Sequence, residues 1–153
     1  MNGWPLFVKP LSEKHFDDRV VTCIADLNGC GFNKENLPVF CSEPVNFQAG
    51  WRCFVRYGKI LDVRPYRGDW RCHYDPRIIE SALAAYTEAP AGYGADFGVT
   101  ADGRTLLVEI NDGYALGSYG LQQNLYAQLL CTRWSRLMNT PDELAYLNAN
   151  TNI

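Results

Sequence analysis

The chain has 153 residues, of which 47% are hydrophobic and 20% are charged, and its formal net charge is −3. A chain of this length typically forms one domain that buries about 70% of the surface exposed by the unfolded chain. The negative charge argues against broad binding to nucleic acid or to membrane surfaces. The sequence also shows no signal peptide and no apolar run of membrane length.

Six cysteines are spread through the chain without a CxxC pair, and the two histidines are not spaced with them as zinc ligands. We therefore expect reduced thiols and a cytoplasmic location. Cys41 and Cys53 fall within predicted strands, where cysteine usually serves as a small core residue.

The first third of the chain predicts two short strands separated by an irregular segment. Residues 5–10 indicate a strand that ends at a proline, and residues 38–41 indicate another. The intervening residues 11–36 are polar and contain glycine turn signals. If the chain works with a partner chain, the first strand should present an unpaired apolar edge, because little sequence precedes it.

The middle of the chain predicts a hairpin followed by a helix. Residues 50–56 and 59–64 flank Tyr57-Gly58, which is a turn signal between two strands. Asp75 suits the N-cap of a helix and Pro76 suits its first position.

The last third predicts a second hairpin and two helices. The strands are residues 94–99 and 107–112, and a turn containing Asp102-Gly103 joins them. A helix over residues 121–138 is followed by a short one that Thr140 caps. The apolar face of the longer helix is expected to contain Leu125, Leu129, Trp134 and Leu137. Antiparallel hairpins with helices packed on one side indicate an α+β fold.

The second hairpin carries three oxygen-bearing side chains. Glu109 and Asn111 lie two residues apart on one strand and face the same way, and Asp96 lies on the other strand. If Asp96 faces the same side, the three form a site for a hard cation. Mg²⁺ uses one or two carboxylates together with waters and substrate phosphates. The pattern predicts a Mg²⁺ site in a phosphate-handling enzyme, and a solvated acidic surface is the alternative.

Taken in chain order, these motifs resemble the ATP-grasp superfamily and, more narrowly, the small bacterial and phage branch of predicted ATP-grasp ligases. The resemblance covers residues 4–138 and implies an antiparallel ATP-grasp-like sheet that is truncated at its N-terminus. It rests on four groups of residues, which are Phe7-Val8-Lys9-Pro10 with Lys14, Cys41-Ser42-Glu43-Pro44-Val45, Trp51-Arg52-Cys53-Phe54-Val55 with Tyr66-Arg67-Gly68-Asp69, and Val108-Glu109-Ile110-Asn111-Asp112 with Gly117-Ser118-Tyr119-Gly120.

The resemblance implies a nucleotide-binding role for the first part of the chain. Lys9 would contact the phosphates of ATP, and Lys14 would assist as a point charge. Glu43, Pro44 and Val45 would form the hinge behind adenine.

The resemblance implies metal binding and charge neutralisation for the second part. Asp96, Glu109 and Asn111 would hold Mg²⁺ on ATP, and Arg52 and Arg64 would face the transferred phosphate or the acyl phosphate. An ATP-grasp ligase makes an acyl phosphate from a carboxylate, and an amine or thiol then displaces the phosphate. Such a reaction needs placement and charge neutralisation rather than a protein nucleophile. The substrates would be a small-molecule or peptide carboxylate and an amine.

Two departures from the family pattern leave alternatives open. Gly50 stands seven residues after Glu43, where the superfamily usually has an acidic residue that holds the ribose. The expected domain at residues 1–140 is also partial, with residues 141–153 forming a short helix and tail. The alternatives are a non-catalytic nucleotide-binding or interaction module, or a half-enzyme that needs a partner chain or a homo-oligomer. Considered without the family pattern, Arg52 could simply form an ion pair with Asp62 or Glu43 on the surface.

Overall fold

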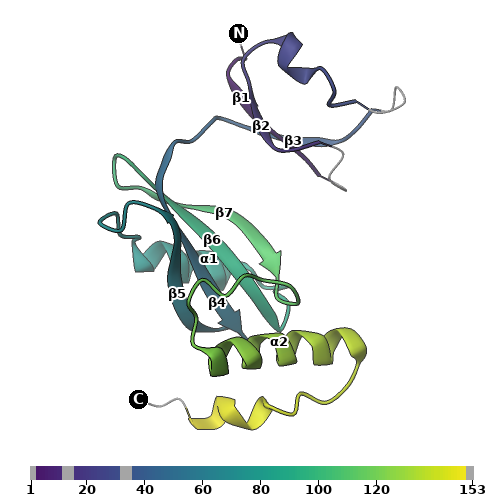
Figure 1. Ribbon diagram of the computed structural model, residues 1–153, viewed down its shortest axis with the longest axis vertical. Helices are drawn as coiled ribbons and strands as arrows, with labels where there is room; N and C mark the ends of the chain where they lie inside the picture. The colour runs from purple at the N-terminus through teal and green to yellow at the C-terminus, as the bar shows by residue number, and fades with distance from the viewer. Residues whose placement is uncertain (1–2, 12–15, 32–35, 151–153) are drawn as a thin grey trace. The chain divides into compact units, whose positions relative to one another are not determined.

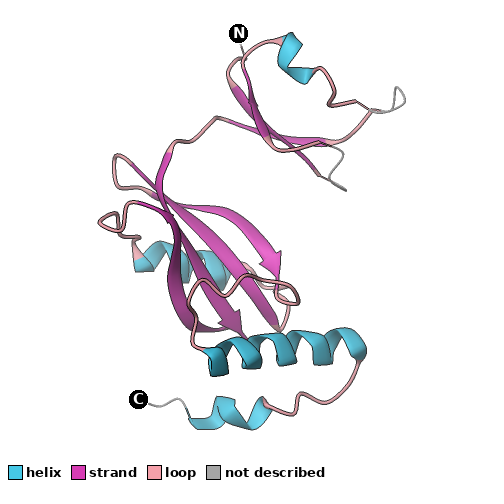
Figure 2. Ribbon diagram, in the orientation of Figure 1, coloured by secondary structure: helices cyan, strands magenta, loops and turns pink. Residues whose placement is uncertain are grey.

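The computed structural model describes residues 3–11, 16–31 and 36–150. Its contacts divide the chain into two compact units, Met1–Asn46 and Phe47–Ile153, which we call the first and the second unit. The first unit has short strands and one helical turn, whereas the long strands and both α-helices lie in the second (Figures 1 and 2).

The first unit contains a three-stranded antiparallel sheet in the order β2-β1-β3. The strands are β1 (Leu6–Pro10), β2 (Arg19–Val21) and β3 (Val39–Ser42), and a 3-10 turn, η1 (Ile24–Leu27), follows β2. The predicted strands at 5–10 and 38–41 are confirmed. The expectation of an irregular segment over 11–36 is wrong, because β2 and η1 lie within it. A three-residue strand is too short to show an alternating pattern.

β1 is the central strand of this sheet, with β2 on one side and β3 on the other. The expectation of an unpaired apolar edge on this strand is therefore wrong. Both partners come from later in the chain, and Val8 of β1 packs with Phe16 and Val21 in a small core. Cys41 in β3 is exposed, contrary to its expected place in a core.

The second unit contains a four-stranded antiparallel sheet in the order β5-β4-β6-β7. The strands are β4 (Phe47–Arg56), β5 (Lys59–Gly68), β6 (Gly92–Thr100) and β7 (Thr105–Asp112), so both predicted hairpins are confirmed. Tyr57 and Gly58 both have positive φ, as a tight two-residue hairpin turn requires.

The helices α1 (Pro76–Ala85) and α2 (Gln123–Met138) cover opposite faces of this sheet (Figure 1). Ile79 of α1 packs with a cluster that includes Cys53, whereas Leu129 of α2 packs with Phe54. Neighbouring residues of a strand point to opposite faces. The predicted α+β fold with an antiparallel sheet is confirmed, but the helices do not pack together on one side.

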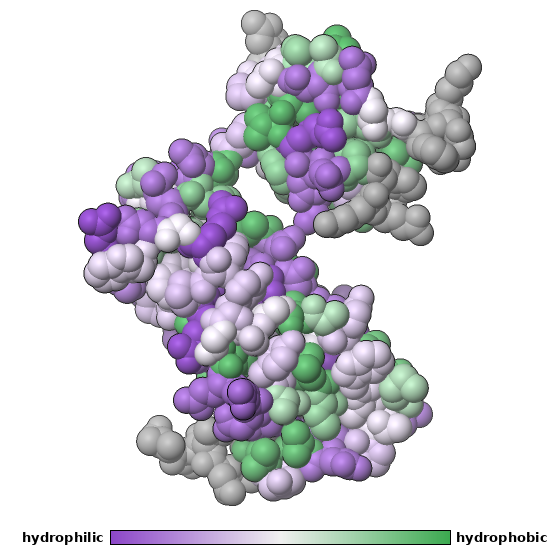
Figure 3. Space-filling model, viewed as in Figure 1, coloured by the Kyte–Doolittle hydropathy of each residue, from purple (hydrophilic) through white to green (hydrophobic). Residues whose placement is uncertain are grey.

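α2 turns a largely polar face toward the sheet. Gln128, Thr132 and Ser135 are buried, while Trp134 and Leu137 are 49% and 46% exposed. The expected apolar face is therefore wrong for these last two residues. Figure 3 shows hydrophobic side chains on the surface over α2 and the segment after it.

Arg56, which is 1% exposed, explains the polar face of α2. Its guanidinium leaves β4 toward the helix, where Nε donates to Thr132 Oγ1 at 2.6 Å and Nη1 donates to Gln128 Oε1 at 2.9 Å. Nη2 donates to Asp142 Oδ2 at 3.1 Å and to the Leu144 carbonyl at 2.8 Å. A buried charge requires partners of this kind, so polar side chains replace apolar ones on this face.

Asp142 holds the segment after α2 against the sheet through hydrogen bonds. Its carboxylate also accepts hydrogen bonds from Tyr57 and Thr132 at 2.8 Å and 2.6 Å. A short helix does form in the expected segment, but it is the 3-10 helix η2 (Ala145–Asn150), which begins five residues beyond Thr140, so Thr140 does not cap it. Contacts to a buried arginine, rather than a capping box, fix this segment.

Candidate functional site

Four charged or amide side chains form a cluster on the α2 side of the second sheet. Arg52 on β4 lies opposite Asp96 on β6, and Asp96 lies opposite Glu109 on β7. Asn111 follows Glu109 by two residues and therefore shares its face. The predicted convergence of Asp96, Glu109 and Asn111 follows from this strand register.

The cluster is linked by direct hydrogen bonds. Arg52 Nε and Nη2 donate to the two oxygens of Asp96, both at 2.6 Å. Asn111 Nδ2 donates to Asp96 Oδ2 at 3.3 Å and to Glu109 Oε1 at 3.0 Å. Arg52 and Asp96 are buried, whereas Glu109 and Asn111 are half-buried. The hydrogen bonds with Asp96 raise the pKa of Arg52, which keeps its charge.

A glycine on β6 makes room for the arginine. A Cβ atom added to Gly94 would lie 3.2 Å from Cδ of Arg52 and 3.0 Å from a methyl group of Leu116. Contacts of this length would require Arg52 or Leu116 to shift by a few tenths of an ångström. The absence of a side chain at this position thus leaves room for Arg52 beside the neighbouring strand.

Two tyrosines border Arg52, one from β5 and one from the loop before α2. The Arg52 guanidinium lies 4.9 Å from the ring centre of Tyr119, and this ring lies 5.5 Å from that of Tyr66. Tyr119 also has a positive φ of 44°, which is uncommon for a bulky residue. The Gly117-Ser118-Tyr119-Gly120 motif marked this loop, but only the folded chain brings it beside Arg52.

The oxygen atoms of this cluster suit a hard cation. Asp96, Glu109 and Asn111 offer carboxylate and amide oxygens, which Mg²⁺ prefers together with waters and phosphate oxygens. Carboxylate oxygens that accept from an arginine still have lone pairs available. Across the described ranges, no group of three or more His, Cys, Asp or Glu side chains is arranged to hold a metal, and this set contains only two carboxylates.

Arg64 lies directly opposite Arg52 on β5. Its Nη2 lies 2.7 Å from Asp62 Oδ2, and its Nε is buried without a hydrogen-bond partner. The surface pair considered for Arg52 does not form, because Asp96 occupies its guanidinium.

The remaining predicted residues belong to the first unit. Lys9 Nζ lies 4.0 Å from Asp18 Oδ2. Glu43 is exposed, and Pro44 and Val45, which follow β3, are half-buried. Lys14 lies outside the described residues.

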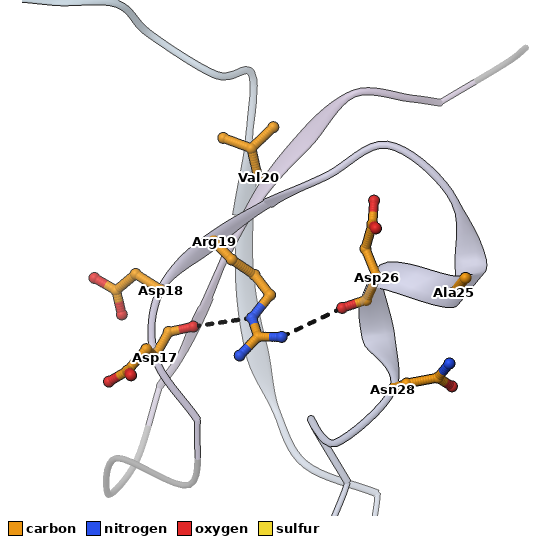
Figure 4. Close-up of a pocket in the computed structure, with 7 residues that line it drawn as sticks. All are labelled: Asp17, Asp18, Arg19, Val20, Ala25, Asp26 and Asn28. Carbon is orange, nitrogen blue, oxygen red and sulfur yellow. Dashed lines mark hydrogen bonds between the residues drawn. The ribbon is translucent and has the colours of Figure 1, made fainter.

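An acidic hollow in the first unit has its own internal partners (Figure 4). Arg19 lies between its two sides and donates to the backbone carbonyls of Asp17 at 3.3 Å and Asp26 at 3.4 Å. The Asp26 carboxylate accepts from Thr22 and Cys23, and these bonds, led by the Thr22 hydroxyl, lower its pKa. These contacts give the hollow a structural role at the start of η1.

Comparison with known proteins identifies the family of the chain. The family model that matches residues 1–129 is described as an ATP-grasp domain, the second family of its clade. The chain belongs to this ATP-grasp family. The resemblance found in the sequence motifs is thereby confirmed.

Solved structures share the ATP-grasp fold of this chain. D-alanine–D-alanine ligase from Bacillus anthracis matches 90% of the chain with a TM-score of 0.60 and 17% identity. N5-carboxyaminoimidazole ribonucleotide synthetase from Thermotoga maritima matches 91% with a TM-score of 0.54 and 16% identity. The matched regions are 54% and 40% of those proteins, so this ATP-grasp chain spans about half the length of its structural relatives.

Two further comparisons complete the description of this ATP-grasp chain. Among curated proteins, no sequence gives a significant match. No helix within the described residues has the length and apolar character needed to cross a membrane.

Proposed function

We propose that this ATP-grasp domain is the ATP-binding part of a Mg²⁺-dependent ligase, which activates a carboxylate as an acyl phosphate and joins it to an amine or thiol. The observation that carries the proposal is the shared sheet face of Asp96, Glu109 and Asn111, with Arg52 beside them. The set combines oxygen ligands for a cation with a fixed positive charge for phosphate.

Each residue of the cluster has a role in this proposal. Glu109 and Asn111 offer oxygens from one rigid strand, and Asp96 adds a carboxylate from the strand beside it. Bound Mg²⁺ would neutralise part of the phosphate charge of ATP. Arg52, held on Asp96, and Arg64 would place positive charge beside the transferred phosphate or acyl phosphate. Backbone hydrogen bonds of the sheet hold these groups in place, which favours electrostatic catalysis.

The nucleotide contacts assigned to the first unit remain predictions. Lys9 and Lys14 are proposed to contact phosphates, and Glu43, Pro44 and Val45 are proposed as the adenine hinge. Alanine variants of Lys9 and Glu43 test these roles through the affinity for the nucleotide.

The decisive experiment is a calorimetric titration of the chain with Mg²⁺ and a non-hydrolysable ATP analogue. Micromolar binding is expected, and Glu109→Gln should weaken it by about tenfold or more, because a charged metal ligand is lost. This variant keeps an acceptor for Asn111, so the fold should persist. Glu88→Gln, which changes an exposed carboxylate on another part of the unit, is the matched control. Equal affinity in Glu109→Gln and the control would show that the metal assignment is wrong.

A non-catalytic nucleotide-binding or interaction module is the second candidate function, and Gly50 favours it. A Cβ atom at this position would lie 2.5 Å from the ring of Tyr66. An acidic side chain for the ribose therefore has no room there while Tyr66 keeps its place. Nucleotide binding without ADP release, over a panel of carboxylates and amines, would support this candidate over the ligase.

A further inference from the structure

Two arginines face each other across the second sheet, and each has a donor group left over. Arg52 and Arg64 are register partners on β4 and β5, a position where like charges destabilise a sheet. Asp96 and Asp62 offset these charges. Nη1 of Arg52 donates to no described residue, and it is not among the fully buried atoms without a partner. Nε of Arg64, in contrast, is buried without an acceptor.

A donor that is buried without an acceptor, as Nε of Arg64 is, indicates a missing acceptor. Buried polar groups in folded proteins are nearly always hydrogen-bonded, and each exception calls for an explanation. Two cationic groups with spare N–H donors match the two oxygens of a carboxylate. An anionic ligand would satisfy both donors and reduce the repulsion between the guanidinium groups.

The tyrosines beside this arginine pair supply the second half of a binding site. Tyr119 stacks on Arg52 and on Tyr66, and it remains 44% exposed. Neither phenol hydroxyl has a hydrogen-bond partner within the described part of the chain. The exposed ring of Tyr119, stacked on the half-buried ring of Tyr66, lies next to spare cationic donors and so offers an apolar surface and a charged end together.

A tight turn in the backbone positions the ring of Tyr119. Three residues other than glycine have positive φ among those described, namely Tyr57, Tyr119 and Asn139. Tyr57 forms a hairpin turn, and Asn139 is the left-handed C-cap of α2. Tyr119 and Gly120 form the centre of a turn that the Leu121 amide closes by donating to the Ser118 carbonyl at 2.8 Å, and this turn sets the ring of Tyr119 beside Arg52.

We propose that the sheet face formed by Arg52, Arg64, Tyr66 and Tyr119 binds the carboxylate substrate, and that this substrate carries an aromatic ring next to its carboxylate. The inference rests on the proposed ligase function and adds the class of substrate. The carboxylate takes the spare N–H groups of the arginines, and the ring packs against the tyrosines. Cation-π contact with Arg52 and ring stacking both favour a planar ring over a saturated one.

Binding of simple carboxylates to the unmodified chain is the first test. Phenylacetate and cyclohexylacetate carry the same charge and similar apolar bulk, but only phenylacetate is aromatic. Saturation-transfer NMR titrations should give phenylacetate an affinity about 2- to 10-fold higher, as expected for one aromatic pair. Benzyl alcohol, which lacks the carboxylate, should bind more weakly than phenylacetate. Equal affinity for phenylacetate and cyclohexylacetate would overturn the proposal.

Variants then locate the site on the molecule. Tyr119→Leu should remove the preference for phenylacetate. Tyr114→Leu should keep it, because Tyr114 is a similarly exposed tyrosine of the same loop that packs on Trp134 instead. Arg64→Gln should weaken both carboxylates alike. An unchanged preference in folded Tyr119→Leu would contradict the assignment, and Tyr66→Leu provides the same comparison if Tyr119→Leu does not fold.

These experiments test the substrate class separately from the proposed ligase function. Nucleotide binding without a preference for phenylacetate would refute the substrate class alone. A preference for phenylacetate that depends on Tyr119, in a chain that binds no Mg²⁺-nucleotide, would refute the ligase and leave an aryl-carboxylate binding site.

Discussion

The buried pair of Arg52 and Asp96 makes Asp96→Asn a test of stability as well as of metal binding. The variant removes the negative charge and leaves the guanidinium in place. Arg52 and Asp96 are only 7% and 3% exposed, so water cannot replace the lost partner. We expect the second unit to be clearly less stable in this variant, which would complicate any simple interpretation of lost activity.

The size of the effect follows from the geometry. Removing one partner of a buried ion pair typically costs about 3–5 kcal/mol. Asparagine retains one acceptor oxygen for Arg52, and the stacking on Tyr119 remains, so we expect the lower end, about 3 kcal/mol. For a unit of about 100 residues, 1 kcal/mol corresponds to roughly 4 °C or more in Tm, which predicts a decrease of about 12 °C.

Urea unfolding followed by near-UV circular dichroism measures this change. Glu109→Gln is the matched control, because Glu109 is half-buried and its amide replacement still accepts from Asn111. It should stay within about 1 kcal/mol of the parent chain. The double variant Arg52→Met/Asp96→Leu should recover much of the loss, since it leaves no unpaired charge. A value for Asp96→Asn within about 1 kcal/mol of the parent would refute this account of the pair.

Three further predictions concern stability and reactivity. Burial raises the pKa of Asp142, but hydrogen bonds led by those from Thr132 and Tyr57 outweigh it and hold the pKa below its ordinary value. The charged Asp142 stabilises the fold above about pH 4, and this contribution is lost as the pH falls through the lowered pKa. The free energy of unfolding in urea should therefore decrease less between about pH 5 and pH 2 in Asp142→Asn than in the parent chain. Asp75→Ala should cost about 1 kcal/mol in thermal unfolding, because Asp75 caps α1; no loss would refute the cap. Burial raises the pKa of the Cys53 thiol to about 12, so a thiol reagent should modify it only after unfolding, whereas exposed cysteines react at once.

Local signals in the sequence were sufficient for most of the second unit. Asp75 and Pro76 mark the start of α1, and the Asp75 side chain accepts from the Arg77 amide as a cap should. Tyr57-Gly58 marks the first hairpin turn. The spacing of Glu109 and Asn111 on one strand placed both on one face. Each of these features depends on residues close together in the chain.

The errors came from contacts between residues far apart in the chain. Arg56 approaches α2 from β4 and requires polar partners there, so Thr132 is buried while Trp134 is exposed. No helical pattern in the sequence contains that information. The ion pair between Arg52 and Asp96 likewise depends on the register of β4 against β6, because the two residues are 44 positions apart in the chain.

The place of β1 in the first sheet sets an order for folding. A central strand needs hydrogen bonds on both edges, and β1 precedes both of its neighbours in the chain. During synthesis at about 5–20 residues per second, β1 must wait until Ser42 at the end of β3 has emerged, so it is exposed for a few seconds at most. The small sheet therefore closes only after its last strand is available, with β3 as the step that completes it.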